Sequence, residues 1–479
     1  MPVFNMMQGG GSISGGGDYG TLPQQVTNFK AGAEFEKVLL TWSNPSDPNF
    51  SGVSIVRKLI SYPTKPSDGV QIYNGSSQTT EDAGLTNGVT YYYRAFAYNS
   101  NQEYQTIECF ALATPAAYHV YGVCIDTLNS NPETSVTYTE DAIGMTGGSS
   151  NWNDTPIFNN IKPCLLKNGV VQYYLSPDNL TKKIDGTESV LTGADGDVMV
   201  EIPKLGLKFV NDAINNKQYI YLTDNPDATI QDFHYYAHTR SVEGDKDKLY
   251  IGAYLGQDVS GQLHSYSGVM PTNNVSLPNF RTYAQANGTG YDLVSFYPLT
   301  LLQALYLLKY KNLDSQTTLG QGLVTGSAHI TGTTNLSNRD YGTTSMTQQM
   351  CFQNIEDFWG NLRWWIDGFY SNSTYNILTA TNNFNNTGDA YTDCGQGVTS
   401  NSSGYMSSIQ GTSQTGFVPK LMTGSSTTYY SDLNVFYNNT VSCFGGGYDA
   451  GETAGCFYFI INFDTIHGYP DTGARLMYL

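Results

Sequence analysis

The fold of this chain is signalled most strongly by Asn354-Ile-Glu-Asp-Phe-Trp-Gly-Asn-Leu-Arg-Trp-Trp-Ile-Asp-Gly368. Two glycine-containing segments come after it, Cys443-Phe-Gly-Gly-Gly-Tyr448 and Gly473-Ala-Arg475. Glycine permits backbone turns with a positive φ, and Trp359 and Trp365 are large enough to fill a small core. A late arginine can bind several backbone carbonyls through its five donors. The series therefore predicts a rigid scaffold of tight turns.

The composition of the whole chain agrees with a β-rich protein. Of the 479 residues, 50 are Gly and 37 are Tyr, while charged residues make up only 13%. Turn residues separate short aromatic and β-branched runs, a pattern typical of strands. The sequence predicts a mostly β, or α+β, fold with two to four domains.

The charge and the apolar runs exclude two classes of partner. The net charge is −18, from 23 basic and 41 acidic residues, which repels phosphate backbones, so we expect no nucleic-acid binding. No apolar run reaches the ~18 residues of a membrane span, so we expect no membrane insertion. The first residues lack the basic and apolar regions of a secretory signal peptide, which predicts synthesis and initial residence in a cytosol.

Residues 25–115 have the strand spacing of one β-sandwich. Turn residues separate the expected strands, which are Lys37–Trp42, Gly52–Arg57, Gln71–Tyr73 and Thr90–Tyr98. Apolar residues alternate along the first of these strands and therefore share one face. The segment resembles a fibronectin type III domain. The family's core tryptophan is matched by Trp42, and its tyrosine corner by Leu85, Gly88 and Tyr91.

Two segments flank this sandwich. Residues 1–24 join an apolar stretch to a Gly/Ser run, which indicates either a flexible anchor that docks into a larger particle or a frayed terminus. The anchoring side chains would be Val3, Phe4, Met6 and Met7. Residues 116–192 contain strand-like runs and predict a small β subdomain, or a β extension that packs on the C-terminal domain.

From residue 193 onward the pattern becomes α+β. Strands are expected at Asp197–Ile202 and Lys248–Tyr254. A helix is expected after Pro298, because leucines recur there with helical spacing, at Leu301, Leu302, Leu305 and Leu308. A shorter helix is predicted over Asn279–Ala286.

Residues 193–479 resemble C-type lectin-like domains of the sulfatase-modifying-factor type. That family shares an Asp-x-x-Gly-Asn-x-x-x-Trp motif, a Gly-Gly segment and a terminal Gly-x-Arg. The matching residues here are Asp357, Gly360, Asn361, Trp365, Gly445, Gly446, Gly473 and Arg475. The resemblance implies a lectin-like domain with a binding face near the C-terminus. Carried over, that face comprises Tyr448, Asp449, Tyr458, Asn462, Asp464 and His467.

A fibronectin-like module ahead of this lectin type resembles structural proteins of tailed bacteriophages. The resemblance implies a head or tail fibre or decoration subunit of the virion, assembled in the host cytoplasm. Its N-terminal segment would bind capsid or tail proteins, and its C-terminal face would bind a host-surface glycan or protein. Fibres are usually symmetric, so a homo-oligomer, and in particular a trimer, is expected.

The sequence lacks the groupings that catalysis needs. Its seven cysteines are scattered without a C-x-x-C pair, which favours free, buried thiols. The cysteine-oxidising relatives of the lectin type use two cysteines near the C-terminus, where Cys456 stands alone here. His234 and His238 have the outer spacing of the zinc motif H-E-x-x-H, but Tyr235 replaces the glutamate and extended structure is favoured. We therefore expect no enzyme, no metal site and no cofactor.

Two other functions remain open at this level. A bacterial surface glycan-binding protein would share the aromatic and short polar residues, although it would need an export signal. A polysaccharide depolymerase would need two carboxylates placed across a sugar bond, and acidic pairs such as Asp195 and Asp197 exist in the sequence.

Overall fold

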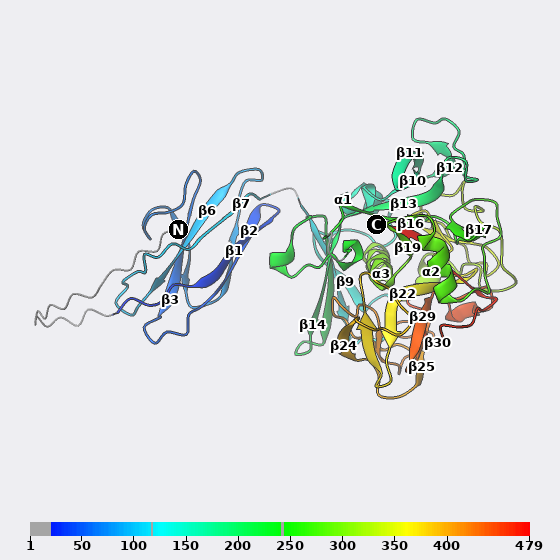
Figure 1. Cartoon of the computed structure of the whole chain (residues 1–479). Coiled ribbons are helices and arrows are strands. Elements are labelled where there is room, and N and C mark those ends of the chain that lie inside the picture. Colours follow the sequence, from blue (N-terminus) through cyan, green and yellow to red (C-terminus); the bar gives the residue numbers. More distant parts are fainter. Residues whose placement is uncertain (1–20, 116–117, 241–243) are drawn as a thin grey trace, which may run out of the picture. The chain divides into compact units, whose positions relative to one another are not determined.

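The computed structural model describes residues 21–115, 118–240 and 244–479. The chain divides into two compact units, with the division between residues 117 and 118 (Figure 1). Strands dominate the described residues of both units, which confirms the predicted mostly β fold. The boundary expected after residue 115 lies within two residues of the observed division.

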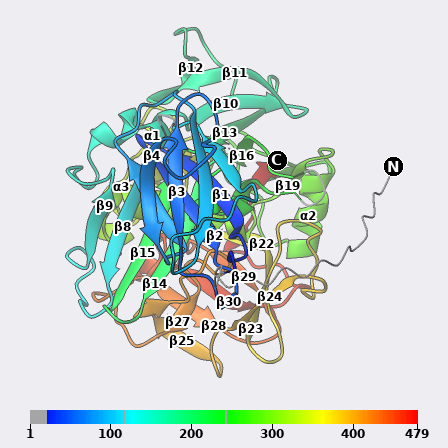
Figure 2. The ribbon, with the colours of Figure 1, turned by 90° about the vertical axis from the view of Figure 1, so that its left-hand side faces the viewer.

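Unit 1 is built from two antiparallel sheets. The first sheet has the order β1 (Thr27–Glu34), β2 (Lys37–Ser43) and β5 (Thr79–Ala83). The second has the order β4 (Val70–Gly75), β3 (Gly52–Lys58), β6 (Tyr91–Tyr98) and β7 (Phe110–Ala113). Figure 2 shows the blue strands β1 to β4 running roughly alongside one another. All four strands expected from the sequence are present, to within a few residues at their ends.

Alternating burial explains how the sheets of unit 1 pack. Val38, Leu40 and Trp42 of β2 are at most 4% exposed, as expected for the inner face of a strand. The predicted tyrosine corner is also present, because the backbone N–H of Thr86 donates to the Tyr91 hydroxyl at 3.0 Å. The strand order and this corner give unit 1 a fibronectin type III-like fold.

Unit 2 contains three larger sheets in the part of the chain that is described. One has the order β14 (Gly206–Asp212), β15 (Lys217–Thr223), β8 (Val120–Asp126) and β9 (Val136–Glu140). Another has the order β12 (Asn179–Lys183), β11 (Val170–Ser176), β10 (Lys162–Lys167), β13 (Asp197–Pro203), β16 (Lys248–Gly252), β32 (Leu476–Tyr478) and β19 (Tyr291–Leu293). The third has the order β24 (Thr392–Gln396), β23 (Asn376–Thr379), β22 (Arg363–Ser371), β29 (Thr440–Phe444), β30 (Phe459–Phe463), β28 (Leu433–Phe436) and β25 (Ser402–Tyr405), and β31 (Thr472–Gly473) also pairs with β22. Short two-stranded ribbons join β17 (Gln257–Val259) to β18 (Gln262–His264), β20 (Cys351–Phe352) to β21 (Ile355–Glu356), and β26 (Ser408–Ile409) to β27 (Pro419–Leu421).

Residues 118–192 do not form the separate small β subdomain that the sequence predicted. They are instead the alternative, an extension that packs on the rest of unit 2. Strand β8 lies between β9 and β15, and β10 pairs with β13 over residues 162–166 and 197–201. Buried residues from Tyr121 to Leu479 belong to one core. The strands of this segment pair with strands of the following sequence and bury their apolar side chains in the same core, so the segment completes sheets of the larger unit.

The predicted long helix is present but more buried than its pattern indicated. Helix α3 spans Phe296–Tyr310, so it begins two residues before Pro298, and every residue in it is buried. It lies near the middle of unit 2 in Figure 1. Its polar side chains have internal partners: Gln303 donates to the Cys456 carbonyl at 2.8 Å, and Lys309 binds Asp340. Burial on all sides therefore replaces the expected single apolar face.

The other helices of the described chain are short. The helix predicted at Asn279–Ala286 is α2, Leu277–Gln285, displaced by one or two residues. The remaining turns of helix are η1 (Ser150–Asp154), α1 (Pro156–Asn159), η2 (Thr229–Gln231), η3 (Tyr236–His238), α4 (Ser315–Thr318) and η5 (Gly451–Thr453). None of the helices in the described ranges combines the length and the apolar character needed to cross a membrane.

Candidate functional site

Arg475 is the centre of the buried scaffold that the motif series predicted. Its side chain is fully buried and donates to the carbonyl oxygens of Gly252 at 2.8 Å, Glu356 at 2.5 Å and Asp357 at 3.2 Å. Its guanidinium carbon also lies 4.1 Å from the ring centroid of Trp364, within cation–π range. One arginine thus joins β16, β21 and β22, which are far apart in the sequence.

Two carboxylates lie beside this arginine and accept hydrogen bonds from internal groups, although Oδ1 of Asp357 has no partner among the described residues. Asp357 accepts from the side-chain amides of Asn361 and Gln349, each at 2.8 Å. Glu356 accepts from the backbone N–H and the hydroxyl of Thr334, each at 2.8 Å. Burial raises the pKa of Asp357 well above its ordinary value, and the charge of Glu356 adds to the rise. Both acids are at most 1% exposed, so a substrate in solvent does not reach them.

The motif glycines meet where the backbone turns. The N–H of Gly360 donates to the carbonyl of Gly446 at 3.2 Å, and both residues have positive φ, +85° and +81°. A Cβ on Gly360 would lie 2.9 Å from the backbone of Leu323, so only glycine fits there. Trp365 is fully buried, and its indole N–H donates to the Val275 carbonyl at 3.0 Å.

The predicted binding residues nearest to this scaffold gather around Arg363. Its guanidinium forms ion pairs with Asp471 and, at 3.4 Å, with Asp449. Its Nε–H donates to the Tyr458 hydroxyl at 3.0 Å. Asp449 keeps 51% of its side chain exposed. The sequence prediction that Tyr458 contacts a ligand is wrong, because that residue is only 4% exposed and its hydroxyl is already bound.

A second group of predicted residues lies on the segment between β30 and β31. The Asp464 carboxylate is 2.7 Å from Nδ1 of His467, and the two side chains are 48% and 65% exposed. Burial acts to raise the pKa of Asp464, but hydrogen bonds from His467 and from the backbone of Ile466 outweigh it, and the pKa is lowered. In the described residues no hydrogen bond or ion pair connects this pair with the Arg363 group.

The remaining predicted residues differ in exposure. Asn462 is exposed on β30, whereas Tyr448 is half-buried and packs against the larger core. The backbone N–H of Tyr448 donates to the Asn361 carbonyl at 2.8 Å, which ties this face to the motif. The predicted anchor residues lie outside the described residues; they are Val3, Phe4, Met6 and Met7. The sequence analysis did not identify Arg363, which binds side chains of this face, although Arg363 lies inside the motif.

The cysteines of the described ranges form no disulfide, and His238 lies in the interior of unit 2. All seven cysteines are free, and burial raises the pKa of Cys456 well above its ordinary value. His238 is fully buried in a 3-10 turn, where its Nε2 accepts from the N–H of Leu205 at 3.4 Å. The extended conformation predicted for the His234–His238 segment is therefore wrong at its end. No group of three or more metal-binding side chains occurs among the residues that the structure describes.

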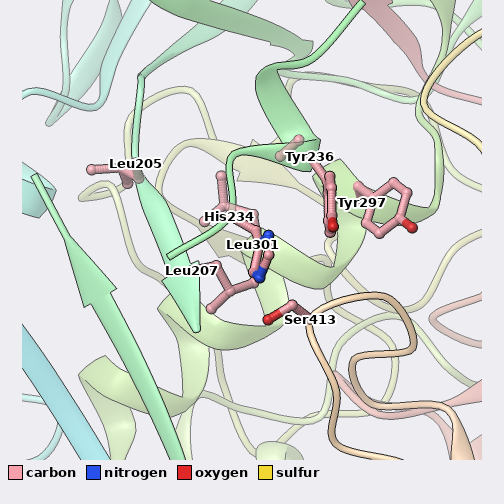
Figure 3. A pocket seen from close by; sticks show the side chains of 8 residues that line it. Leu205, Leu207, His234, Tyr236, Tyr297, Leu301 and Ser413 are labelled. Carbon is pink, nitrogen blue, oxygen red and sulfur yellow. The ribbon is translucent and has the colours of Figure 1, made fainter. Parts of the chain in front are cut away.

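A small cavity adjoins His234, and Figure 3 shows the side chains that line it. The ring of Tyr236 lies between two neighbours, with centroids 5.0 Å from His234 and 4.9 Å from Tyr297. The free volume is about 10 Å³, which is enough for one water molecule. The cavity is therefore a packing gap and not a ligand site.

Comparison with solved structures yields likenesses that cover a fifth of the chain. No family model matches the chain, and no curated protein matches its sequence. A crystal structure of FN3tt is 16% identical, with a TM-score of 0.16, and covers 20% of this chain and 97% of that chain. A structure of FN3tt mut is 18% identical, with a TM-score of 0.15 and the same coverage.

Proposed function

We propose that this chain is a structural subunit of a tailed-bacteriophage virion that attaches to a host-surface glycan or protein through unit 2. The observation that carries the proposal is a separation of roles within one sequence motif. The motif residues are turned inward around Arg475, whereas Asp449, which pairs with Arg363, keeps half of its side chain exposed. A rigid interior with an accessible polar surface suits recognition better than chemistry.

The exposed groups favour binding to hydroxyl-bearing or amide-bearing surfaces. Asp449, Asp464 and His467 supply a carboxylate, a second carboxylate and an imidazole, and Asn462 supplies an amide. Such short side chains lose little entropy when they are immobilised. Single contacts of this kind are weak, so many copies on one particle would gain strength through avidity.

The buried thiols argue for a non-enzymatic role. Cysteine chemistry requires a thiolate that a substrate can reach. Cys443 and Cys456 are 0% exposed, and burial raises the pKa of both thiols well above the ordinary value. An oxidation of cysteine to formylglycine would therefore find no accessible thiolate at Cys443 or Cys456.

The proposal includes assembly. The segment 1–24 would bind a capsid or tail protein, and the chains would associate as a homotrimer in the virion. Light scattering of the purified full chain measures the stoichiometry, and a mass of one chain would contradict the trimer.

The virion assignment is tested on purified particles. Antibodies against unit 2 should label intact particles, and labelling should be lost when the segment 1–24 is deleted from the gene. Particles that never contain the chain, although the cells produce it, would overturn the assignment in favour of a bacterial glycan-binding protein.

The attachment role is tested with labelled full chain on the bacteria that the particles infect. Asp449→Ala combined with His467→Ala should lower cell binding at least fivefold. A matched control is Glu188→Ala, since Glu188 is 76% exposed and lies outside the predicted face. Equal binding by both variants would contradict a binding role for this face. Release of reducing sugars during the assay would instead indicate a depolymerase.

A further inference from the structure

A larger cavity lies in unit 2 next to β19 and shares no residue with the surface around Arg363. Its volume is about 300 Å³, at the lower end of the range for small-molecule sites. Its lining comes from the residues after η3, from the end of α2 and β19 with the turn between them, from the loop after β23, and from Leu479 after β32. The side chains that matter are Arg240, Thr289, Asp292, Asn382, Asn383 and Phe384.

Two opposite charges line this cavity without forming an ion pair. The guanidinium of Arg240 donates through Nη1 to the Thr381 carbonyl at 2.6 Å and lies 5.3 Å from the ring centroid of Phe384. Its Nη2 is buried and has no partner in the described residues. Asp292 accepts one hydrogen bond there, from the Gln285 amide at 3.3 Å. Both charged groups thus retain bonding capacity inside a concave site.

The wall behind these groups is held rigidly. Arg281 binds both oxygens of Asp367, at 2.6 and 2.9 Å, and donates to the Asn386 side chain at 2.8 Å. This pair is buried, and it fixes the loop after β23 to α2 and β22. A cavity with such a wall is formed before a ligand arrives, which lowers the entropy lost on binding.

The remaining polar groups are uncommitted. The side-chain amides of Asn382 and Asn383 and the hydroxyl of Thr289 make no hydrogen bond within the described ranges. Amides both donate and accept, as the hydroxyls of a sugar do. The ring of Phe384 adds an apolar surface, which is the usual complement of the C–H face of a sugar.

We infer that this cavity binds one unit of a neutral glycan. One cation and one anion leave the lining without net charge, so neither an acidic nor a basic sugar is favoured. Asp292 accepts hydrogen bonds from ring hydroxyls, and Nη2 of Arg240 donates to a hydroxyl or ring oxygen. A volume of about 300 Å³ is large enough for a single sugar unit.

Saturation-transfer NMR on the full chain tests the inference with glucose, galactose, mannose and N-acetylglucosamine, and with glucuronate as the charged comparison. We expect transfer to at least one neutral sugar and none to glucuronate. No transfer to any of the four neutral sugars, or a preference for glucuronate, overturns the inference. Because these probes need no particle or host cell, the result does not depend on the virion assignment.

Two variants locate the binding. Asp292→Asn should weaken the affinity for the bound sugar about tenfold, because a charge-assisted hydrogen bond becomes a neutral one. Asn382→Ala should weaken it by about fivefold, because the variant loses one hydrogen bond to the sugar. The fold should be unaffected, since the amide of Asn382 makes no hydrogen bond within the described ranges. The control is Asn401→Ala, an exposed residue that does not line the cavity. Thermal unfolding of each variant checks that unit 2 stays folded, and unchanged affinity in both pocket variants overturns the inference.

Discussion

The two units of this chain are stabilised in different ways. Unit 1 has a small apolar core between two sheets, and alternate residues of β2 are buried and half-buried. In unit 2 whole elements are buried, including all of α3 and the first six residues of β13. Charged groups such as Arg475 and Asp357 are buried with them. Unit 1 buries few charged side chains, chiefly Asp82 and Arg94, whereas unit 2 buries a group of them around Arg475.

The largest effect is expected from Arg475→Ala. It removes hydrogen bonds to three carbonyl groups and a cation–π contact, and it leaves the acids beside it without a cation. Breaking a buried charged network of this kind costs about 5 kcal/mol. Calorimetry should show loss of the transition of unit 2 and an unchanged transition for unit 1. A common shift of both transitions would show that the units do not unfold independently.

Trp42→Ala makes the converse test in unit 1. The side chain is 4% exposed and packs with its ring centroid 5.3 Å from that of Tyr73. Truncation of a buried tryptophan costs about 3–5 kcal/mol. The transition assigned to unit 1 should therefore fall while that of unit 2 stays in place. A loss in unit 2 as large as that in unit 1 would contradict the division of the chain.

The difference between the units also explains what the sequence could predict. Period-two alternation and the tyrosine corner are local signals, so four of the seven strands described in unit 1 were predicted to within a few residues at their ends. The long helix of unit 2 was predicted from its leucines, but not that Gln303 and Lys309 would be buried as well. Their partners, Cys456 and Asp340, are distant in the sequence, and no local pattern indicates them.

The candidate sites show the same dependence on distant partners. The sequence identified Asp449, Asp464 and His467 as residues of an accessible face, and the structure leaves them exposed. It placed Tyr458 in that face, yet the tyrosine is buried against Arg363, because it directly precedes β30, which lies inside its sheet. The cavity beside Asp292 was not predicted at all. Its lining comes from segments that are far apart in the sequence, and each contributes only a few ordinary residues.

A smaller effect is expected from Asp292→Asn, which tests whether the cavity of unit 2 stores unfavourable charge. Burial raises the pKa of Asp292 to about 6, and Asp367 adds to the rise while Arg240, Gln285 and Arg281 oppose it. Because the pKa of this carboxyl is raised in the folded state, its contribution to the stability of the fold is fully present below pH ~4. That contribution is lost as the pH rises through about 6. The variant should therefore be about 1–2 kcal/mol more stable than the wild type at pH 8, after allowance for solvent screening.

Urea unfolding at pH 4 and pH 8 measures this difference. At pH 4 the wild type and Asp292→Asn should have the same stability, since the carboxyl of the wild type is then largely protonated. The gain at pH 8 should accompany the weaker sugar affinity expected of this variant, as binding sites often trade stability for function. A stability difference that is the same at both pH values would contradict the burial of a charged carboxylate in the cavity.

The smallest effect is expected from Asp464→Asn, which has the opposite sign. Burial acts to raise the pKa of Asp464, but hydrogen bonds from His467 and the backbone of Ile466 outweigh it and lower the pKa. The ionised carboxylate therefore stabilises the fold above pH ~4, and this stabilisation is lost as the pH falls through the lowered pKa. The side chain is 48% exposed, so the variant should lose only about 0.3–0.5 kcal/mol at pH 7. Urea unfolding in low and high salt measures this loss, which should shrink as salt screens the pair.

Two carboxylates of one unit would then respond oppositely to pH, because one lines a buried cavity and the other lies on an exposed face. If the loss instead exceeds about 2 kcal/mol, well above the range for an exposed pair, the segment between β30 and β31 supports the fold and cannot serve as a freely accessible binding face.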